Sequence, residues 1–259
     1  MPEQWRIGCA GWAIPRQYAE AFPGSGSHLQ RYARRLAAVE INSSFYRPHR
    51  RTTYERWAAA VPDDFAFAVK APQEITHRRR LGLADERLEA FLDQVVGLGD
   101  KLGPLLFQLP PSLRFDRERV GAFFAALRRR FAGSVVCEPR HPDWFTADVE
   151  ALLAEFRIGR VAADPSIVGA AAMPGGWSGV RYLRLHGSPR VYYSEYAADR
   201  LDRFAQLLLS AGEDRRPAWC IFDNTAAGAA IANALALRQR LCVGDGARPV
   251  PVLNLSPQP

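Results

Sequence analysis

Charged side chains able to do chemistry follow short apolar runs along this chain. Lys70, Glu138, Asp164 and His186 each come directly after such a run. Carboxyl and imidazole groups act as general acids and bases, and a lysine amine with a lowered pKa acts as a base or a nucleophile. We therefore expect Glu138 or Asp164 to be a general acid/base and His186 a proton shuttle. Lys70 would stabilise developing negative charge, act as a base or form a Schiff base.

Further polar and aromatic residues near the ends of the same runs make up the expected binding set. Arg140 and Arg184 are suited to holding an anionic group by forked hydrogen bonds, and the amides are suited to orienting hydroxyl groups. An aromatic ring in these loops either stacks on a sugar or a base or only packs the loop. The full expected binding set is Glu40, Asn42, Gln108, Arg140, Arg184, Asp223, Asn224, Trp12, His77 and His141.

The expected site depends on strands whose carboxyl ends lie together. Short apolar runs with strand character alternate with stretches whose apolar residues recur at helical spacing. The expected strands are Arg6–Gly11, Val39–Phe45, Phe65–Ala71, Leu105–Leu109, Ser134–Pro139, Arg160–Asp164, Val180–His186 and Trp219–Asn224. The expected helices are Leu29–Ala38, Leu88–Leu98, Val120–Phe131, Leu201–Leu209 and Ala226–Leu241.

This alternation is typical of an α/β fold, and it predicts a single TIM-type (β/α)8 barrel with eight parallel strands. A doubly wound open sheet is the alternative. That fold usually has a Gly-rich phosphate-binding turn after its first strand, whereas Gly8–Trp12 reads GCAGW and departs from the motif. We predict one barrel domain over residues 1–245 and a Pro-rich tail over residues 246–259.

Alternation of side chains within each strand sorts the polar residues onto one face. Between Phe65 and Lys70, the phenylalanines and Val69 would pack against helices, while the alanines and Lys70 would point inward. By the same rule, Tyr182, Arg184 and His186 would share the inward face of their strand. The strand ends would then form a polar pocket over an apolar core, or else a buried ion-pair network that only stabilises the fold.

Arginines are frequent in the loops that follow these runs, and acidic residues are fewer there. The loop arginines are Arg47, Arg50, Arg51, Arg78, Arg79, Arg80, Arg140 and Arg190. An electropositive mouth would favour anionic ligands such as phosphate esters, carboxylates or a nucleic-acid backbone, whereas the alternative is a solvated basic rim. The net charge of +7 is carried almost wholly by arginine, since only Lys70 and Lys101 among the 34 basic residues are lysines. We attribute this arginine excess to a genomic bias and do not take it as a nucleic-acid signal.

The same acids and His186 raise the question of a divalent metal ion, which prefers oxygen ligands. The sequence has no H-E-x-x-H motif, and three cationic side chains expected in the same pocket would repel a metal. We therefore predict no metal and no other cofactor. A serine-triad hydrolase is not expected either, because no G-x-S-x-G elbow is present.

The composition of the 259 residues, 48% hydrophobic and 24% charged, is that of an ordinary globular protein. No apolar run approaches the roughly 20 residues that a membrane helix needs, and the start of the chain does not resemble a signal peptide. The four cysteines are far apart and suit a reducing compartment. We expect a cytoplasmic protein without a membrane partner.

Several blocks of the sequence occur in the order found in a known family. They are IGCAGW, VEINSSFYR, FAFAVKAPQEITH, KLGPLLFQLPPSLRF, EPRHPDWF, YLRLHG and FDNTAAGAAIANAL. Together, from Ile7 to about Leu237, they resemble the YecE-like family called domain of unknown function 72. The resemblance implies a TIM-type barrel in a soluble bacterial or archaeal protein, and it implies no established activity.

Three functions are compatible with these observations. The first is an enzyme (hydrolase, lyase or isomerase) that acts on a small anionic or sugar-like substrate by general acid/base catalysis. The second is a nucleic-acid-binding or endonuclease-like protein that uses the basic rim. The third is a sensor that binds a metabolite without converting it.

Overall fold

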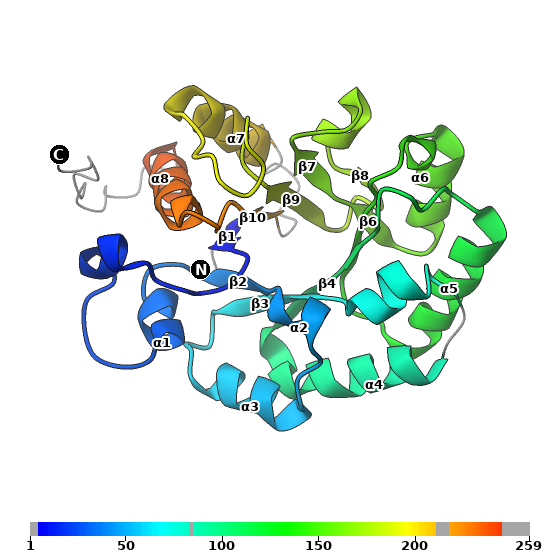
Figure 1. Ribbon diagram of the computed structural model, residues 1–259, viewed down its shortest axis with the longest axis horizontal. Helices are drawn as coiled ribbons and strands as arrows, with labels where there is room; N and C mark the ends of the chain where they lie inside the picture. Colours follow the sequence, from blue (N-terminus) through cyan, green and yellow to red (C-terminus); the bar gives the residue numbers. More distant parts are fainter. Residues whose placement is uncertain (1–4, 83–84, 211–217, 245–259) are drawn as a thin grey trace.

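The strands lie in the middle of the molecule, and the longer helices surround them (Figure 1). The computed structural model describes residues 5–82, 85–210 and 218–244. The parallel strands in this part of the chain are β1 (Trp5–Cys9), β2 (Ala38–Ile41), β3 (Ala66–Lys70), β4 (Leu102–Gln108), β5 (Val135–Glu138), β6 (Ile158–Arg160), β7 (Ala162–Asp164), β9 (Arg181–Leu185) and β10 (Ala218–Phe222). The short β8 (Gly175–Gly176) pairs with β6 in antiparallel fashion.

The helices begin where side chains satisfy free backbone N–H groups. Ser27 and Gln30 form a capping box before α1, and Asp116 and Thr146 cap α5 and α6. The helices are α1 (His28–Ala33), α2 (Ser43–Tyr46), α3 (Arg51–Ala59), α4 (Asp85–Val95), α5 (Arg117–Arg130), α6 (Ala147–Glu155), α7 (Ala198–Ser210) and α8 (Ala229–Gly244). Among the helices described, none has both the length and the apolar character that a membrane crossing requires.

Each predicted strand overlaps an observed one, but the second ends earlier than predicted. The prediction ran to Phe45, whereas β2 ends at Ile41 and the chain turns into α2. Ser44 fixes this turn, because its hydroxyl lies 2.9 Å from the Ile41 carbonyl oxygen and 2.6 Å from that of Lys70. The turn therefore ties the end of β2 to the end of β3.

The strands form two sheets and not one closed sheet. Their orders are β1-β10-β9-β7 and β2-β3-β4-β5-β6-β8. The sheets meet where the Gly11 N–H donates to the Glu40 carbonyl at 2.9 Å. They meet again where Val161 alone separates β6 from β7. The predicted parallel α/β arrangement is confirmed, whereas the strand pairing of the described residues does not close into one eight-stranded sheet.

A tyrosine hydroxyl replaces one strand hydrogen bond at the junction of β1 and β2. A regular parallel ladder would join the Cys9 N–H to the Ala38 carbonyl. Instead, the Tyr32 hydroxyl accepts from the Cys9 N–H at 2.8 Å and donates to the Ala38 carbonyl at 3.0 Å. Gly8 leaves room for this arrangement, because a Cβ at that position would lie 2.0 Å from the Ala38 carbonyl oxygen. The two strands are therefore held slightly apart.

Two apolar clusters occupy opposite faces of the strands. The larger one includes Phe65, Phe67 and Val69 and joins the strands to the helices. The smaller one lies on the other face and consists of Ala10, Ala38, Ala68, Leu106, Val136, Val161, Val180, Tyr182, Trp219 and Ile221. The predicted alternation within the third strand is thus confirmed. The predicted Pro-rich tail, residues 246–259, falls outside the described residues.

Candidate active site

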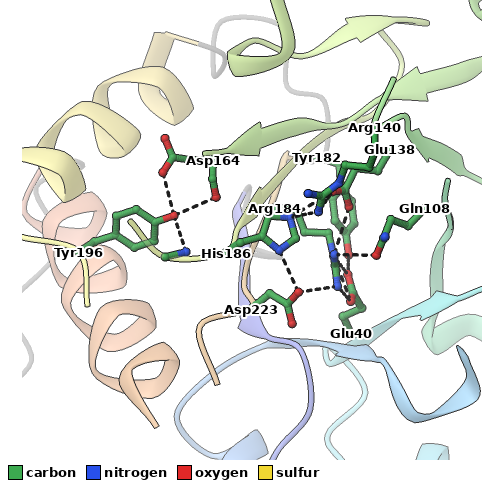
Figure 2. Close-up of polar contacts among 11 residues, drawn as sticks. Glu40, Gln108, Glu138, Arg140, Asp164, Tyr182, Arg184, His186, Tyr196 and Asp223 are labelled. Atoms are coloured by element: carbon green, nitrogen blue, oxygen red, sulfur yellow. Dashed lines mark hydrogen bonds and ion pairs between the residues drawn. The ribbon is translucent and has the colours of Figure 1, made fainter. Parts of the chain in front are cut away.

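Polar residues end the strands at their carboxyl edges, as the sequence predicted. Lys70, Gln108 and Glu138 are the last residues of β3, β4 and β5. Glu40 and Arg184 are the penultimate residues of β2 and β9. Figure 2 shows that many of these side chains, with His186 and Asp223, point toward one another around the Arg184 guanidinium. Residues from both sheets therefore meet in one network.

Arg184 is the centre of this network and is fully buried. Its Nε donates to Glu40 at 3.0 Å, and its Nη2 lies 2.7 Å from Glu40 and 3.1 Å from Asp223. Its Nη1 donates to Glu138 at 3.1 Å and to Gln108 at 3.5 Å. Although burial lowers its pKa, the three carboxylates raise the pKa of Arg184 well above its ordinary value. All of its N–H groups are therefore engaged, and it remains charged.

His186 lies between two carboxylates and an arginine, with no exposed surface. Its Nδ1 is 3.0 Å from Asp223, and its Nε2 is 3.1 Å from Glu138 and 2.7 Å from Arg140 Nη2. Arg140 also forms a short ion pair with Glu138. We assign the proton to Nδ1, because Arg140 can then donate to both Nε2 and Glu138. In this tautomer the Nε2 lone pair accepts the hydrogen bond from Arg140.

Glu138 and Asp223 are held in their ionised forms by their cationic neighbours. Burial alone would raise the pKa of each carboxyl group. The charges of Arg140 and Arg184 outweigh burial at Glu138 and hold its pKa well below the ordinary 4.5. Arg184 and His186 likewise lower the pKa of Asp223 from 3.8. Both carboxylates therefore stay negative at neutral pH, and neither is a proton donor there.

Lys70 differs from these residues because its amine has no counterion in contact. Its side chain is 6% exposed, and Nζ lies 4.1 Å from the centroid of the Phe45 ring. No residue in the described ranges forms a hydrogen bond or an ion pair with Nζ. Burial, followed by the charge of Arg184, lowers the pKa of Lys70 from 10.5 to about 8, although Glu40, Asp223 and Glu138 oppose the shift. A substantial fraction of the amine is therefore neutral near physiological pH.

The surroundings of Lys70 include further residues of the predicted binding set. His77 contacts Phe45 with a ring-centroid distance of 4.9 Å, and burial together with the charge of Lys70 lowers its pKa. The Asn42 amide oxygen is buried and has no hydrogen-bond partner among the described residues. Arg140 Nε is likewise buried without a partner in that part of the chain. Together with the Asn224 amide oxygen, two acceptors and one donor at these positions are thus buried without a hydrogen-bond partner among the described residues.

Asp164 lies apart from the network, although it was expected to join it. The Tyr196 hydroxyl donates to its carboxylate at 2.9 Å, and Arg200 forms a short ion pair with its other oxygen. Figure 2 shows Asp164 and Tyr196 on the far side of His186 from Glu138. Tyr196 also accepts from the Gly187 N–H at 2.8 Å. Asp164 therefore fixes the loop after β9.

The remaining predicted binding residues lie at the edge of the site or outside it. The Asn224 amide nitrogen donates to the Ser194 carbonyl and to Asn233, which links the loop after β9 to α8. Trp12 packs against Trp57, with ring centroids 5.0 Å apart. His141 accepts from the Asp143 N–H and holds the turn after β5. These contacts give all three residues structural partners.

Sequence reasoning missed Tyr182 as a site residue. Its hydroxyl donates to Glu40 at 2.8 Å from beneath the network, and both groups are fully or almost fully buried. Burial and the charge of Glu40 raise the pKa of Tyr182 well above 10.0. Its position two residues before Arg184 on the same strand face was the signal that could have identified it. Tyr182 thus completes the hydrogen bonding of Glu40.

The described residues do not provide a metal site. No group of three or more His, Cys, Asp or Glu side chains in this part of the chain is arranged to hold a metal ion. The physical reason is visible in the network, because the Arg184 and Arg140 guanidinium groups lie between the carboxylates. They occupy the positions in which a cation would be coordinated.

Several of the rim arginines are already paired. Arg78 and Arg79 both form ion pairs with Glu74, and Arg51 pairs with Glu55. Arg80 donates to the Ser112 side chain and carbonyl. These contacts reduce the number of basic side chains that are available to an extended polyanion.

The chain is similar to proteins without an assigned activity. The model of the family described as "Protein of unknown function DUF72" matches residues 6–253. The UPF0759 proteins YunF of Bacillus subtilis and YecE of Escherichia coli K12 are 30% and 29% identical to it over 148 and 147 residues. These segments are 54% and 56% of this chain and 52% and 51% of the relatives, so the chain spans about half the length of the curated relatives it matches.

A solved structure supports the same assignment at the level of the fold. A DUF72 family protein from Enterococcus faecalis superposes with a TM-score of 0.78 at 19% identity, covering 98% of this chain and 99% of the other. The family model extends over almost the whole sequence, including every strand described above. On this evidence the chain belongs to the DUF72 family, which has no established function.

Proposed function

We propose that this protein is an enzyme that acts on a small anionic or sugar-like substrate by general acid/base catalysis at the network. The proposal rests on a difference in ion pairing between Lys70 and the charged residues around it. The paired members of the network are Glu40, Glu138, Arg140, Arg184, His186 and Asp223. The Lys70 amine is buried beside them without a counterion in contact. A network that served stability alone would not keep such a group, because burying an unpaired amine costs free energy.

Binding of the anionic group is assigned to Arg140. Arg184 was expected to share this role, but its N–H groups are all engaged with network residues. Arg140 is partly exposed, and its buried Nε has no hydrogen-bond partner in the described part of the chain. A carboxylate or phosphate oxygen would accept from this Nε, and a substrate hydroxyl would donate to the free Asn42 oxygen.

Proton transfer is assigned to His186 and Lys70. Glu138 and Asp223 remain ionised, so they orient His186 and Arg140 and do not exchange protons near neutral pH. His186 Nε2 is the acceptor in the assigned tautomer, and the Lys70 amine titrates near pH 8 with its pKa at about 8. Two groups of this kind beside one anion-binding arginine suit acid/base chemistry on a small molecule.

We infer further that the two sheets belong to one eight-stranded barrel. Two contacts support this inference: the hydrogen bond from the Gly11 N–H to the Glu40 carbonyl, and the continuity of β6 with β7 through Val161. The small apolar cluster, with residues of both sheets, supports it as well. In such a barrel the network would cover the carboxyl end of the interior, where barrel enzymes bind their substrates.

The test is a thermal-shift screen with sugar phosphates and small carboxylic acids, followed by product detection for every compound that raises Tm. We expect at least one compound to be consumed, and Lys70→Met to lower kcat by about 100-fold or more. Lys101→Met is the matched control and keeps kcat within about twofold, since the partners of Lys101 among the described residues are two backbone carbonyls and Asp63. Full turnover by Lys70→Met would refute the proposal.

The same screen separates the enzyme from the other two functions. A compound that raises Tm and is recovered unchanged would identify a sensor. Binding of DNA or RNA that weakens steeply with salt would identify a nucleic-acid-binding protein. The pairing of Arg51, Arg78 and Arg79 with glutamates gives that function no particular support.

A further inference from the structure

We propose that the Lys70 amine forms an imine with an aldehyde or ketone that carries an anionic group. This inference rests on the proposed function, because it names the substrate class and the covalent step for the same site. It makes Lys70 a nucleophile, which the acid/base proposal alone does not require.

The position of Lys70 suits a nucleophile. It ends β3, and Ser44 holds its carbonyl oxygen, so the backbone at the amine is fixed to the turn after β2. The amine faces the Phe45 ring and retains a small exposed surface. In the described part of the chain it has no hydrogen bond to break before it attacks a carbonyl carbon. The site thus presents a nearly dry amine next to charged groups that can orient a substrate.

The residue type is also informative. The chain carries 34 basic residues, of which Lys70 and Lys101 are the only lysines. A guanidinium group would supply positive charge at position 70 equally well, but it stays protonated and does not condense with carbonyl compounds. A primary amine with a pKa of about 8 is partly neutral at pH 7–8, which condensation requires. Lysine at this position therefore points to amine chemistry.

The proposed step balances without any other reagent. The Lys70 nitrogen attacks the carbonyl carbon and gives a carbinolamine. Both amine hydrogens then leave with the former carbonyl oxygen as water, and a carbon–nitrogen double bond forms. Protonation of this imine would create a cation among the Glu40, Glu138 and Asp223 carboxylates, whose charges already act on Lys70. These carboxylates would offset part of the cost that burial and Arg184 impose on a positive charge at this nitrogen.

The anionic group of the substrate follows from Arg140. Its unpartnered Nε belongs to the same network as the carboxylates that act on Lys70. A substrate with a carbonyl and a carboxylate or phosphate would engage Lys70 with one group and Arg140 with the other. A neutral aldehyde would lack the second contact and would react less selectively.

The experiment is reductive trapping with glyoxylate, the simplest aldehyde that carries a carboxylate. The folded wild-type protein is treated with glyoxylate and cyanoborohydride, and peptide mapping locates each added carboxymethyl group. We expect Lys70 to be labelled at least about tenfold faster than Lys101, with a rate that rises as the pH passes 8. Lys101 is the internal reference, since its Nζ already bonds to the Ala58 and Val61 carbonyls at 2.8 Å.

Two controls make the result specific. In urea-unfolded protein the two lysines should be labelled equally, because the environment of Lys70 is lost. Glycolate has the carboxylate but no carbonyl, so it should compete with glyoxylate in the folded protein, and Arg140→Met should abolish this competition. Because the comparison is made within the wild-type chain, it does not depend on whether a Lys70 variant folds.

The outcomes separate this inference from the proposed function. Selective labelling of Lys70 with competition by glycolate supports both. Equal labelling of the lysines in folded protein, with Arg140-dependent stabilisation by glycolate, refutes the imine and leaves acid/base catalysis standing. Equal labelling without any effect of glycolate overturns the imine and also removes the support for an anion site.

Discussion

At the scale of single residues, Lys70 is destabilising in the free protein. Its pKa is lowered from 10.5 to about 8, chiefly by burial and then by Arg184. Between these two pH values the unfolded chain binds a proton that the folded chain does not. The free energy of unfolding therefore rises with pH across this range, and the full cost of Lys70 is present below pH 8. Such a cost at one residue is common where a site is built for function.

We predict that Lys70→Met raises the free energy of unfolding by about 3 kcal/mol at pH 7. The gain should shrink as the pH rises from 8 towards 10.5, because the cost of keeping the buried amine unprotonated falls until the amine is neutral in both states above pH 10.5. Urea unfolding at pH 7 and pH 10 measures the difference. A variant that is less stable than wild type at pH 7 would contradict this account of Lys70.

At the scale of elements, the close approach of β1 to β2 requires a glycine at position 8. A Cβ at Gly8 would lie 2.0 Å from the Ala38 carbonyl oxygen and 3.1 Å from the Tyr32 hydroxyl. The backbone of a strand cannot yield as easily as the end of a flexible side chain. Any larger residue must therefore move β1 away from β2 and stretch the hydrogen bonds on both sides of Tyr32.

We predict that Gly8→Ala lowers the free energy of unfolding by about 2–4 kcal/mol. Gly121→Ala is the matched control, because Gly121 lies within α5 and a Cβ there meets nothing within 4 Å. The control should be more stable than wild type by about 0.5–1 kcal/mol. Chemical denaturation of the two variants tests the pair, and equal effects would show that the junction is not tightly packed.

The Tyr32 hydroxyl can be tested separately from packing. Tyr32→Phe keeps the ring but leaves the Cys9 N–H and the Ala38 carbonyl without this partner. We expect a loss of about 1–3 kcal/mol, since buried polar groups are costly when unpaired. Hydrogen exchange of the Cys9 amide should also become faster. An unchanged exchange rate would mean that the strands close directly once the hydroxyl is removed.

The strand-end residues could be predicted from the sequence because they follow clear apolar runs. Lys70 and Glu138 are examples, and both lie where strand alternation places them. Their hydrogen-bond partners could not be predicted in the same way. Tyr182 lies inside an apolar run and resembles a core residue, and the partners of Asp164 come from a loop and from α7. Spacing along the chain does not encode such distant contacts.

The fold could be predicted in outline for the same reason. Long periodic stretches identified α5 and α8, whereas α2 spans only Ser43–Tyr46 and is too short to show helical periodicity. The separation of the strands into two sheets has a different cause. At the junction of β1 and β2 it depends on the Tyr32 hydroxyl, which enters the strand ladder, and no pattern of apolar residues indicates such a contact. The sheets also separate between β6 and β7.

At the scale of the whole molecule, the buried network makes the free energy of unfolding depend on pH in the acidic range. The pKa values of Glu138 and Asp223 are lowered in the folded state. Their contribution is therefore present above their ordinary pKa values of 4.5 and 3.8 and is lost as the pH falls below them. Glu138 in β5 joins the two sheets through Arg184 in β9, and Asp223 binds the same guanidinium group, so protonating these carboxylates weakens the contact between the sheets.

We predict that Glu138→Gln lowers the free energy of unfolding by about 3–5 kcal/mol at pH 7, because Arg184 and Arg140 lose a carboxylate. At pH 3 the difference from wild type should be smaller, since the unfolded wild-type carboxyl group is then protonated. Denaturant titrations at both pH values test this. Glu89→Gln is a surface control that removes the exposed ion pair with Arg130, and its effect should stay below about 1 kcal/mol.

The pairing of β1 with β10 also determines the order in which the molecule can be completed during synthesis. Strands β2 to β6 follow one another in both sequence and sheet, so each can dock as it leaves the ribosome. β1 is made first, yet Trp5 is aligned with Ala218 near the other end of the chain. A nascent chain that lacks β10 would leave one edge of β1 unpaired. The charged centre, which takes residues from both sheets, is therefore assembled last.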